Sequence, residues 1–187
     1  MLPFPVKNDP QKARGSLIGG VPRDGDLHIC FQWAAENGIP INPDGKTYDP
    51  NAMNFVEVDD FKKADDKLIA GYCETRPIVQ DQKLTGEKRT VCQNGTATWT
   101  PGDVKIATMK GGLVAVASTR EYRNQMAAIV IGNKQWMSEN RAFMTNFLAA
   151  AFEGGEAVRS DADALTKASD IAAVVFKEET GAYWKKY

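Results

Sequence analysis

Polar groups that could hold a ligand occur at three places, each at a predicted junction between a strand and a turn or helix. Residues 23–26 (RDGD) combine charged side chains with a glycine, residues 99–103 (WTPGD) combine an indole ring with a hydroxyl, and residues 118–119 (ST) offer two hydroxyls. Backbone N–H groups, hydroxyls and an aromatic ring can together bind a small polar or anionic molecule. We therefore predict ligand binding by Asp24, Gly25, Asp26, Trp99, Thr100, Ser118 and Thr119.

The alternative interpretation of these segments is structural, with Trp99 in the core and residues 23–26 forming a simple turn. Other chemistry has little support. The only histidine, His28, lies one residue from the apolar face of a predicted helix, where a structural role is typical. The acidic pairs at 59–60 and 65–66 are interpreted as a solvated helix start and face.

No motif in the sequence predicts a cofactor or a metal. The cysteines and the histidine lack zinc-binding spacing, and the phosphate-binding loop is absent. Residues 44–49 (DGKTYD) lack the glycine and glutamate placement of a calcium loop. We therefore expect no enzyme. Two alternatives stay open: a small α/β hydrolase or transferase with Asp24 or Asp26 as base, and an interaction module that binds a protein through the segment 73–92 and the C-terminal YWKKY.

Cys73 and Cys92 bracket the polar segment ETRPIVQDQKLTGEKRTV, which has too few apolar residues to be anchored by burial. A disulfide that closes a loop of this length would add about 3 kcal/mol of stability. It would also indicate an oxidising compartment. We predict this disulfide, with two unpaired thiols as the alternative. Cys30 lies on the apolar face of the first predicted helix and is interpreted as a small buried residue.

The composition is that of a globular protein. The chain has 187 residues, 43% of them hydrophobic and 25% charged, with a formal net charge of -1. This apolar content suffices for a core. The near-zero charge, without a basic patch interleaved with aromatic residues, argues against nucleic-acid binding. No apolar run has the length of a membrane span, and no signal peptide precedes the chain, so we expect a cytosolic protein or a missing natural N-terminus.

The elements that must position the ligand-binding groups alternate between strand and helix. Apolar runs predict strands at 16–21 and 53–58, each followed by a helix: one that Asp26 caps and Gly38 ends, and one at 61–72 that Asp59 and Asp60 cap. Residues 95–100 predict another strand. Because the carboxyl ends of parallel strands share one edge, we expect the segments around Asp24 and Trp99 to meet at one rim.

The second half of the sequence predicts mainly helices. Residues 112–118 (GLVAVAS) predict a buried strand, and Ser118 with Glu121 matches a capping box. Helices are expected at 129–137, at 141–152 before the glycine pair 154–155, and after a cap at 160–161. This order predicts an α/β fold with helices on the faces of the sheet. We expect an α/β ligand-binding lobe at 1–110 and a strand with returning helices at 111–187.

Several segments of the sequence resemble a known protein family. The string GLVAVASTREYRNQMAAIVIGNKQWMSENRAFMTNFLAAAFEGG resembles the later part of substrate-binding proteins of ABC transporters, in the nitrate/taurine/phosphate-like branch of the type II periplasmic binding fold. RDGDLHICFQWAAENGIPIN, YDPNAMNFV, GYCETR and TATWTPGDVKIA resemble phosphate-type members, some of which are fused to an OmpA-like peptidoglycan-binding domain. The resemblance implies a periplasmic-binding-protein-like lobe with a mainly parallel sheet flanked by helices, followed by C-terminal helices.

The resemblance also implies a mechanism of binding without catalysis. Two lobes close by hinge motion on a small polar or anionic solute, and the closed form docks on an ABC permease at the membrane. Family members have a first lobe and a secretion signal before this region, so we expect the chain to be a fragment. The implied location is periplasmic or extracytoplasmic. Peptidoglycan would be a partner only through a fused domain outside this sequence, and nucleic acid is not an expected partner.

Overall fold

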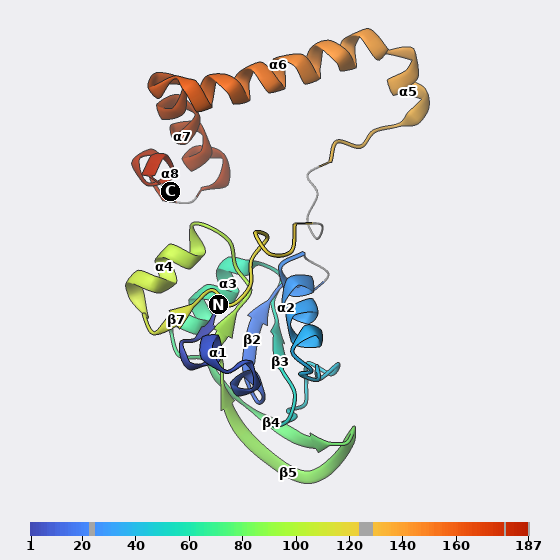
Figure 1. Cartoon of the computed structure of the whole chain (residues 1–187), viewed down its shortest axis with the longest axis vertical. Coiled ribbons are helices and arrows are strands. Elements are labelled where there is room, and N and C mark those ends of the chain that lie inside the picture. Colours follow the sequence, from blue (N-terminus) through green and yellow to red (C-terminus); the bar gives the residue numbers. More distant parts are fainter. Residues whose placement is uncertain (23–24, 124–128, 178, 187) are drawn as a thin grey trace. The chain divides into compact units, whose positions relative to one another are not determined.

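The computed structural model describes residues 1–22, 25–123, 129–177 and 179–186. The chain divides into two compact units, Met1–Ala127 and Ala128–Tyr187, and each unit is described by itself (Figure 1). The fold is mixed α/β with a small parallel sheet and helices, which confirms the predicted fold class at this level.

The parallel sheet of the first unit has three strands. The central strand β2 (Leu17–Gly20) lies between β3 (Asn54–Glu57) and β6 (Gly95–Thr96), and both neighbours run parallel to it. All four residues of β2 are buried, as expected of a parallel strand that is covered on both faces. Strands were predicted for all three segments; each is shorter than expected, and the third, with two residues, differs most.

One helix follows each parallel strand. Helix α2 (Gly25–Glu36) follows β2, α3 (Phe61–Ile69) follows β3, and α4 (Gly102–Met109) follows β6. The prediction of α3 is confirmed, although the helix ends at Ile69 and not at residue 72. Helix α4 was not predicted, because its start lies inside the segment WTPGD, whose proline and glycine are typical of a turn.

The helix caps correct one expectation and confirm another. Asp60 precedes α3, and its carboxylate accepts a hydrogen bond from the Lys62 backbone N–H at 2.8 Å, as predicted. Asp26 was expected to cap α2. The helix instead begins two residues earlier than this cap requires, at Gly25, so Asp26 lies in the first turn, where a negative charge is favourable with the helix dipole.

Two apolar clusters cover the two faces of the sheet. Ile18 belongs to one cluster, with residues from α2 and the N-terminus, and Leu17 belongs to the other, with residues from α3 and β3. Neighbouring residues of a strand point to opposite faces, so β2 joins the clusters. Burial of one such side chain contributes about 1.5–3 kcal/mol.

A second, two-stranded sheet adjoins the parallel one. Strand β1 (Leu2–Pro3) pairs antiparallel with β7 (Leu113–Val114), and the N–H of Thr96 in β6 donates to the Met1 carbonyl. The buried strand predicted at 112–118 is therefore wrong in length and place, since β1 occupies the edge beside β6. The short helices α1 (Pro5–Asn8) and η1 (Pro10–Ala13) lead from β1 to β2.

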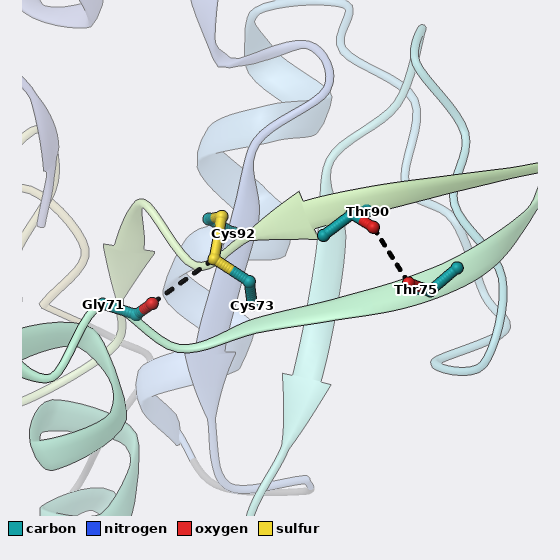
Figure 2. Close-up of a disulfide and its surroundings, with 5 residues drawn as sticks. All are labelled: Gly71, Cys73, Thr75, Thr90 and Cys92. Atoms are coloured by element: carbon teal, nitrogen blue, oxygen red, sulfur yellow. Dashed lines mark hydrogen bonds between the residues drawn. A yellow bond between two sulfur atoms is a disulfide. The ribbon is translucent and has the colours of Figure 1, made fainter.

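The predicted disulfide between Cys73 and Cys92 is present, and it closes a hairpin where a loop was expected (Figure 2). Strands β4 (Cys73–Gln80) and β5 (Lys83–Cys92) pair antiparallel, with the two cysteines opposite each other. Asp81 and Gln82 both have positive φ, as in a two-residue type I′ hairpin turn. Neither residue is a glycine, and the strands are polar, so no local pattern predicts a hairpin here.

One buried arginine anchors the hairpin. Arg76 is 3% exposed, and its guanidinium donates to the carbonyls of Thr47 at 3.2 Å and Phe55 at 3.0 Å. It also pairs with Glu74 at 2.6 Å. The base of the hairpin is thus held to β3 by hydrogen bonds, in addition to the burial of Val91 of β5 in the same apolar cluster as Val56.

The second unit consists of helices α5 (Lys134–Glu139), α6 (Arg141–Ser160), α7 (Ala162–Phe176) and α8 (Gly181–Lys186). Asp161 caps α7 as predicted, because its carboxylate accepts from the Asp163 N–H at 2.9 Å. Two expectations are wrong. The first helix begins at Lys134 and not at 129, and α6 continues through Gly154 and Gly155.

Most apolar side chains of the second unit are exposed. Phe147 of α6 is 51% exposed, and Ile171 of α7 is 62% exposed. Among the helices in the described ranges, none combines the length and the apolar character that a membrane crossing requires.

Candidate functional site

A cavity of about 300 Å³ lies in the first unit, beside the carboxyl end of β6 and the face of β2 that carries Ile18. Its walls come from three parts of the chain: the segment 96–100 at the end of β6, the first turns of α2, and the segment 115–119 after β7. Ile18, Met53, Asp103 and the first two residues of the chain complete the lining. All of these residues belong to one compact unit.

The strand order explains why a cavity forms here. The chain enters the sheet at β2 in the centre, passes to β3 on one side and later to β6 on the other. The boundary between the neighbouring strands β2 and β6 is therefore a topological switch point: β3 and β6 were added to opposite sides of β2. In open α/β sheets, ligands bind outside the carboxyl ends of the strands at such a point.

The structure brings most of the predicted binding residues to this cavity. Five of them line it: Asp26, Trp99, Thr100, Ser118 and Thr119. Gly25 begins α2 and is not among the lining residues, and Asp24 lies outside the described residues. The rim expected from the strand-end argument is therefore formed by three separate segments. The ligand-binding role of these residues stays a prediction.

Trp99 lines the cavity, is partly exposed, and packs against an aromatic ring of α3. Its side chain is 42% exposed, so it is not the core residue of the alternative interpretation. The ring of Phe61 in α3 lies against it, with 4.1 Å between ring centroids and 54° between planes. Such aromatic pairs add stability beyond their burial, so α3 fixes the position of an accessible indole.

Ser118 and Glu121 form hydrogen bonds of the kind expected of a capping box, but no helix follows them. The Ser118 N–H and hydroxyl both donate to the Glu121 carboxylate, at 2.9 and 2.6 Å. This hydrogen bonding lowers the pKa of Glu121. Residues 121–123 form no helix, so the box here stabilises a turn at the edge of the cavity.

Asp65 of α3 lies directly behind the wall. It is only 2% exposed, and its two oxygens accept hydrogen bonds from the hydroxyls of Thr96 at 3.0 Å and Thr98 at 2.7 Å, both of which line the cavity. Burial raises the pKa of this carboxyl to about 6, although the two threonine hydrogen bonds act in the opposite direction.

The prediction that Asp65 lies on a solvated helix face is wrong. The interpretation holds for its neighbour Asp66, which is exposed and pairs with Lys105 at 2.9 Å. A signal for Asp65 was available. Residues 61, 64, 65 and 68 recur at the spacing of one helix face, and the other three are apolar, so Asp65 shares the buried face of α3.

The charged groups of the lining are mainly acidic. Asp26 of α2 and Asp103 of α4 line the cavity, and no lysine or arginine side chain among the described residues does so. The one cation is the amine of Met1, which donates to the Thr96 carbonyl and whose pKa is lowered by burial. Cys30 also lines the cavity, and burial raises the pKa of its thiol.

No group of three or more histidine, cysteine, aspartate or glutamate side chains in the described residues could hold a metal ion. Comparison with known proteins gave no match to a family model, to a curated protein or to a solved structure. Fold and site together define a mixed α/β protein with a small cavity at the switch point of its parallel sheet.

Proposed function

We propose that this chain binds a small polar solute in the cavity beside the carboxyl end of β6. The observation that carries the proposal is the convergence of Asp26, Trp99, Thr100, Ser118 and Thr119 on one cavity at a topological switch point. The volume of about 300 Å³ suits a small molecule. An indole ring with hydroxyls and a carboxylate offers both an apolar contact and hydrogen bonds.

The proposal extends to the class of protein that the sequence resembles. The chain would be the solute-binding component of an ABC transporter, with this α/β unit as one periplasmic-binding-protein-like lobe and a second lobe outside this sequence. Binding would favour the closed state, which docks on the permease. The Cys73–Cys92 disulfide is compatible with a periplasmic or other extracytoplasmic location.

The enzymatic alternative is not proposed. A carboxyl with a raised pKa is a common sign of a general base, and Asp65 has this property. Both of its oxygens, however, accept hydrogen bonds from threonines, and Asp65 is not among the residues that line the cavity. A base must reach the proton that it removes.

Tryptophan fluorescence tests the binding function. Trp33 and Trp99 line the cavity, and the other two tryptophans lie in the second unit, so Trp136→Phe with Trp184→Phe leaves only the two reporters. Titration with inorganic phosphate, taurine, amino acids and small amines should give a saturable change for one class. Native mass spectrometry of the purified protein should detect a bound small molecule.

A matched pair of variants locates the binding. Thr100→Val removes a hydroxyl that lines the cavity, and Thr108→Val removes an exposed hydroxyl that bonds only within α4. We expect Thr100→Val to weaken binding about tenfold, the loss expected for one ligand hydrogen bond, and Thr108→Val to leave it unchanged. Equal affinities in both variants, or no response to any probe, would contradict the proposal.

A further inference from the structure

Three elements meet at the buried carboxylate of Asp65. Asp65 itself belongs to α3, and the hydroxyls of Thr96 and Thr98 reach it from the end of β6. The third element is α4, whose first residue Gly102 lies so close that an added Cβ would come within 2.2 Å of Asp65 Oδ2 and 2.3 Å of Thr98 Oγ1. The carboxylate is therefore tightly enclosed.

The enclosed carboxylate holds the segment that presents Trp99 and Thr100 to the cavity. The other partners of the two hydroxyls are backbone carbonyls at 3.3–3.4 Å, longer than the bonds to Asp65. Hydrogen bonds to an ionised carboxylate are also about twice as strong as neutral ones. Asp65 is thus the dominant partner of the two threonine hydroxyls, in addition to the backbone hydrogen bonds of Thr96 and Ala97.

We propose that Asp65 is a positioning residue that makes ligand binding in this cavity depend on pH. When ionised, the carboxylate accepts from both threonine hydroxyls and fixes the segment 96–100 at the rim. When protonated, the carboxyl donates through one oxygen, so one threonine hydroxyl must become the acceptor and redirect its own hydrogen, and both bonds are then neutral and weaker. Ligand affinity, which rests on the proposed binding function, then decreases.

The direction of the pH effect follows from the chemistry of this group. Burial raises the pKa of Asp65 to about 6, so the carboxylate is ionised at neutral pH and protonated in mildly acidic solution. We therefore expect affinity to be highest above this pKa and to fall by about tenfold as the pH decreases through 6, the difference between a charge-assisted and a neutral hydrogen bond.

Other charged groups surround Asp65 and need controls. The Met1 amine, beside β1, lowers the pKa of Asp65, and Asp66 on α3 raises it. From α4, Lys105 pairs with Asp66, and Asp103 acts on the Met1 amine. The amine is removed by N-terminal acetylation. Asp66→Asn removes one negative charge next to Asp65 without touching the threonines.

The experiment uses the whole chain with Trp136→Phe and Trp184→Phe and records fluorescence from pH 4 to pH 8. Without ligand, we expect a transition near pH 6 that disappears in Asp65→Asn and persists in Asp66→Asn and in the acetylated protein. Thr98→Val removes a hydrogen bond that lowers the pKa of Asp65. Its transition should therefore move to higher pH, which a purely structural role of Asp65 would not cause.

The binding arm repeats the titrations with phosphate, taurine and a small amine at pH 5 and pH 7. Loss of the pH dependence of affinity in Asp65→Asn, with retention in Asp66→Asn, supports the inference. A fluorescence transition in the absence of any binding would leave Asp65 as a positioning residue but overturn the proposed function. Wild-type protein without a transition near pH 6, or a transition that survives in Asp65→Asn, overturns the inference whatever the probes do.

Discussion

Two opposing effects act on the carboxyl of Asp65. Burial disfavours the charged form and raises the pKa, and the hydrogen bonds from Thr98 and Thr96 favour the charged form and lower it. Burial dominates, and the pKa reaches about 6. The carboxylate at neutral pH is therefore a costly group, retained at a position where two threonines of the cavity wall depend on it.

This cost should appear in the stability of the protein. Because the pKa of Asp65 is higher in the folded chain than the ordinary value of 3.8, the folded state retains a proton that the unfolded chain loses first. The contribution of this group to the free energy of unfolding is complete below pH 4 and decreases as the pH rises through 6. The total loss is on the order of 3 kcal/mol.

Urea denaturation from pH 4 to pH 8 measures this contribution. Asp65→Asn should remove the decrease between pH 4 and pH 7, and Asp66→Asn should retain it. The sign is opposite to that of ligand affinity, which we expect to increase over the same range. Parallel pH profiles of stability for wild-type protein and Asp65→Asn would show that this carboxyl does not titrate in the window.

At the scale of elements, the β4–β5 hairpin depends on few contacts. Its strands are mostly exposed, and its base is held by the Cys73–Cys92 disulfide and by the buried Arg76. Thr75 and Thr90 add one hydrogen bond of 2.9 Å across the strands. Covalent and polar interactions thus add to the small apolar contact that Val91 and Ile78 make with the core.

Removal of the disulfide should lower the stability of the protein substantially. Cys73→Ser with Cys92→Ser should lower the free energy of unfolding by about 3 kcal/mol, because the unfolded chain regains the entropy of the open loop. Urea denaturation gives the total, and amide hydrogen exchange shows whether the hairpin opens first. Thr90→Ala, which removes one exposed hydrogen bond, is the control and should cost about 1 kcal/mol. Equal losses in the two variants would contradict the entropic account.

The elements that the sequence predicted well have one clear local signal. Strands β2 and β3 are apolar runs, and Asp60 is a standard cap for α3. The hairpin was not predicted because its strands are largely polar and lack the alternation of apolar and polar residues. Helix α4 was not predicted because a proline and a glycine at its start indicate a turn. Helix α6 continues through Gly154 and Gly155 because alanine and glutamate on both sides outweigh a cost of about 1 kcal/mol per glycine.

The candidate site was predictable to the extent that topology determined it. The rule that strand ends share an edge brought Asp26, Trp99 and Thr100 together correctly. Asp65 was not found in this way, because its role depends on burial by α4, an element that the sequence reading lacked. Periodicity along α3 alone would have placed it on the buried face.

At the scale of the whole molecule, the two units differ in how they are stabilised. Every apolar residue that is buried in the described part of the chain lies in the first unit, and the cavity lies there too. In the second unit, the buried residue among those described is Ser169, whose hydroxyl donates to the carbonyl of Leu165 at 2.8 Å. Apolar burial, the main source of folding stability, is therefore concentrated in one unit.

This distribution predicts different behaviour of the two units when they are separated. Residues 1–127 alone should unfold cooperatively and retain the fluorescence transition near pH 6, because Asp65, Thr96, Thr98 and Trp99 all belong to that unit. Residues 128–187 alone should have partial helicity and a broad thermal transition, because isolated helices without a buried face are marginal in water. Circular dichroism with thermal unfolding of the two fragments and of the whole chain measures both. A sharp transition of fragment 128–187 would show that its helices form a core of their own, and an unfolded fragment 1–127 would show that the first unit needs the second to fold.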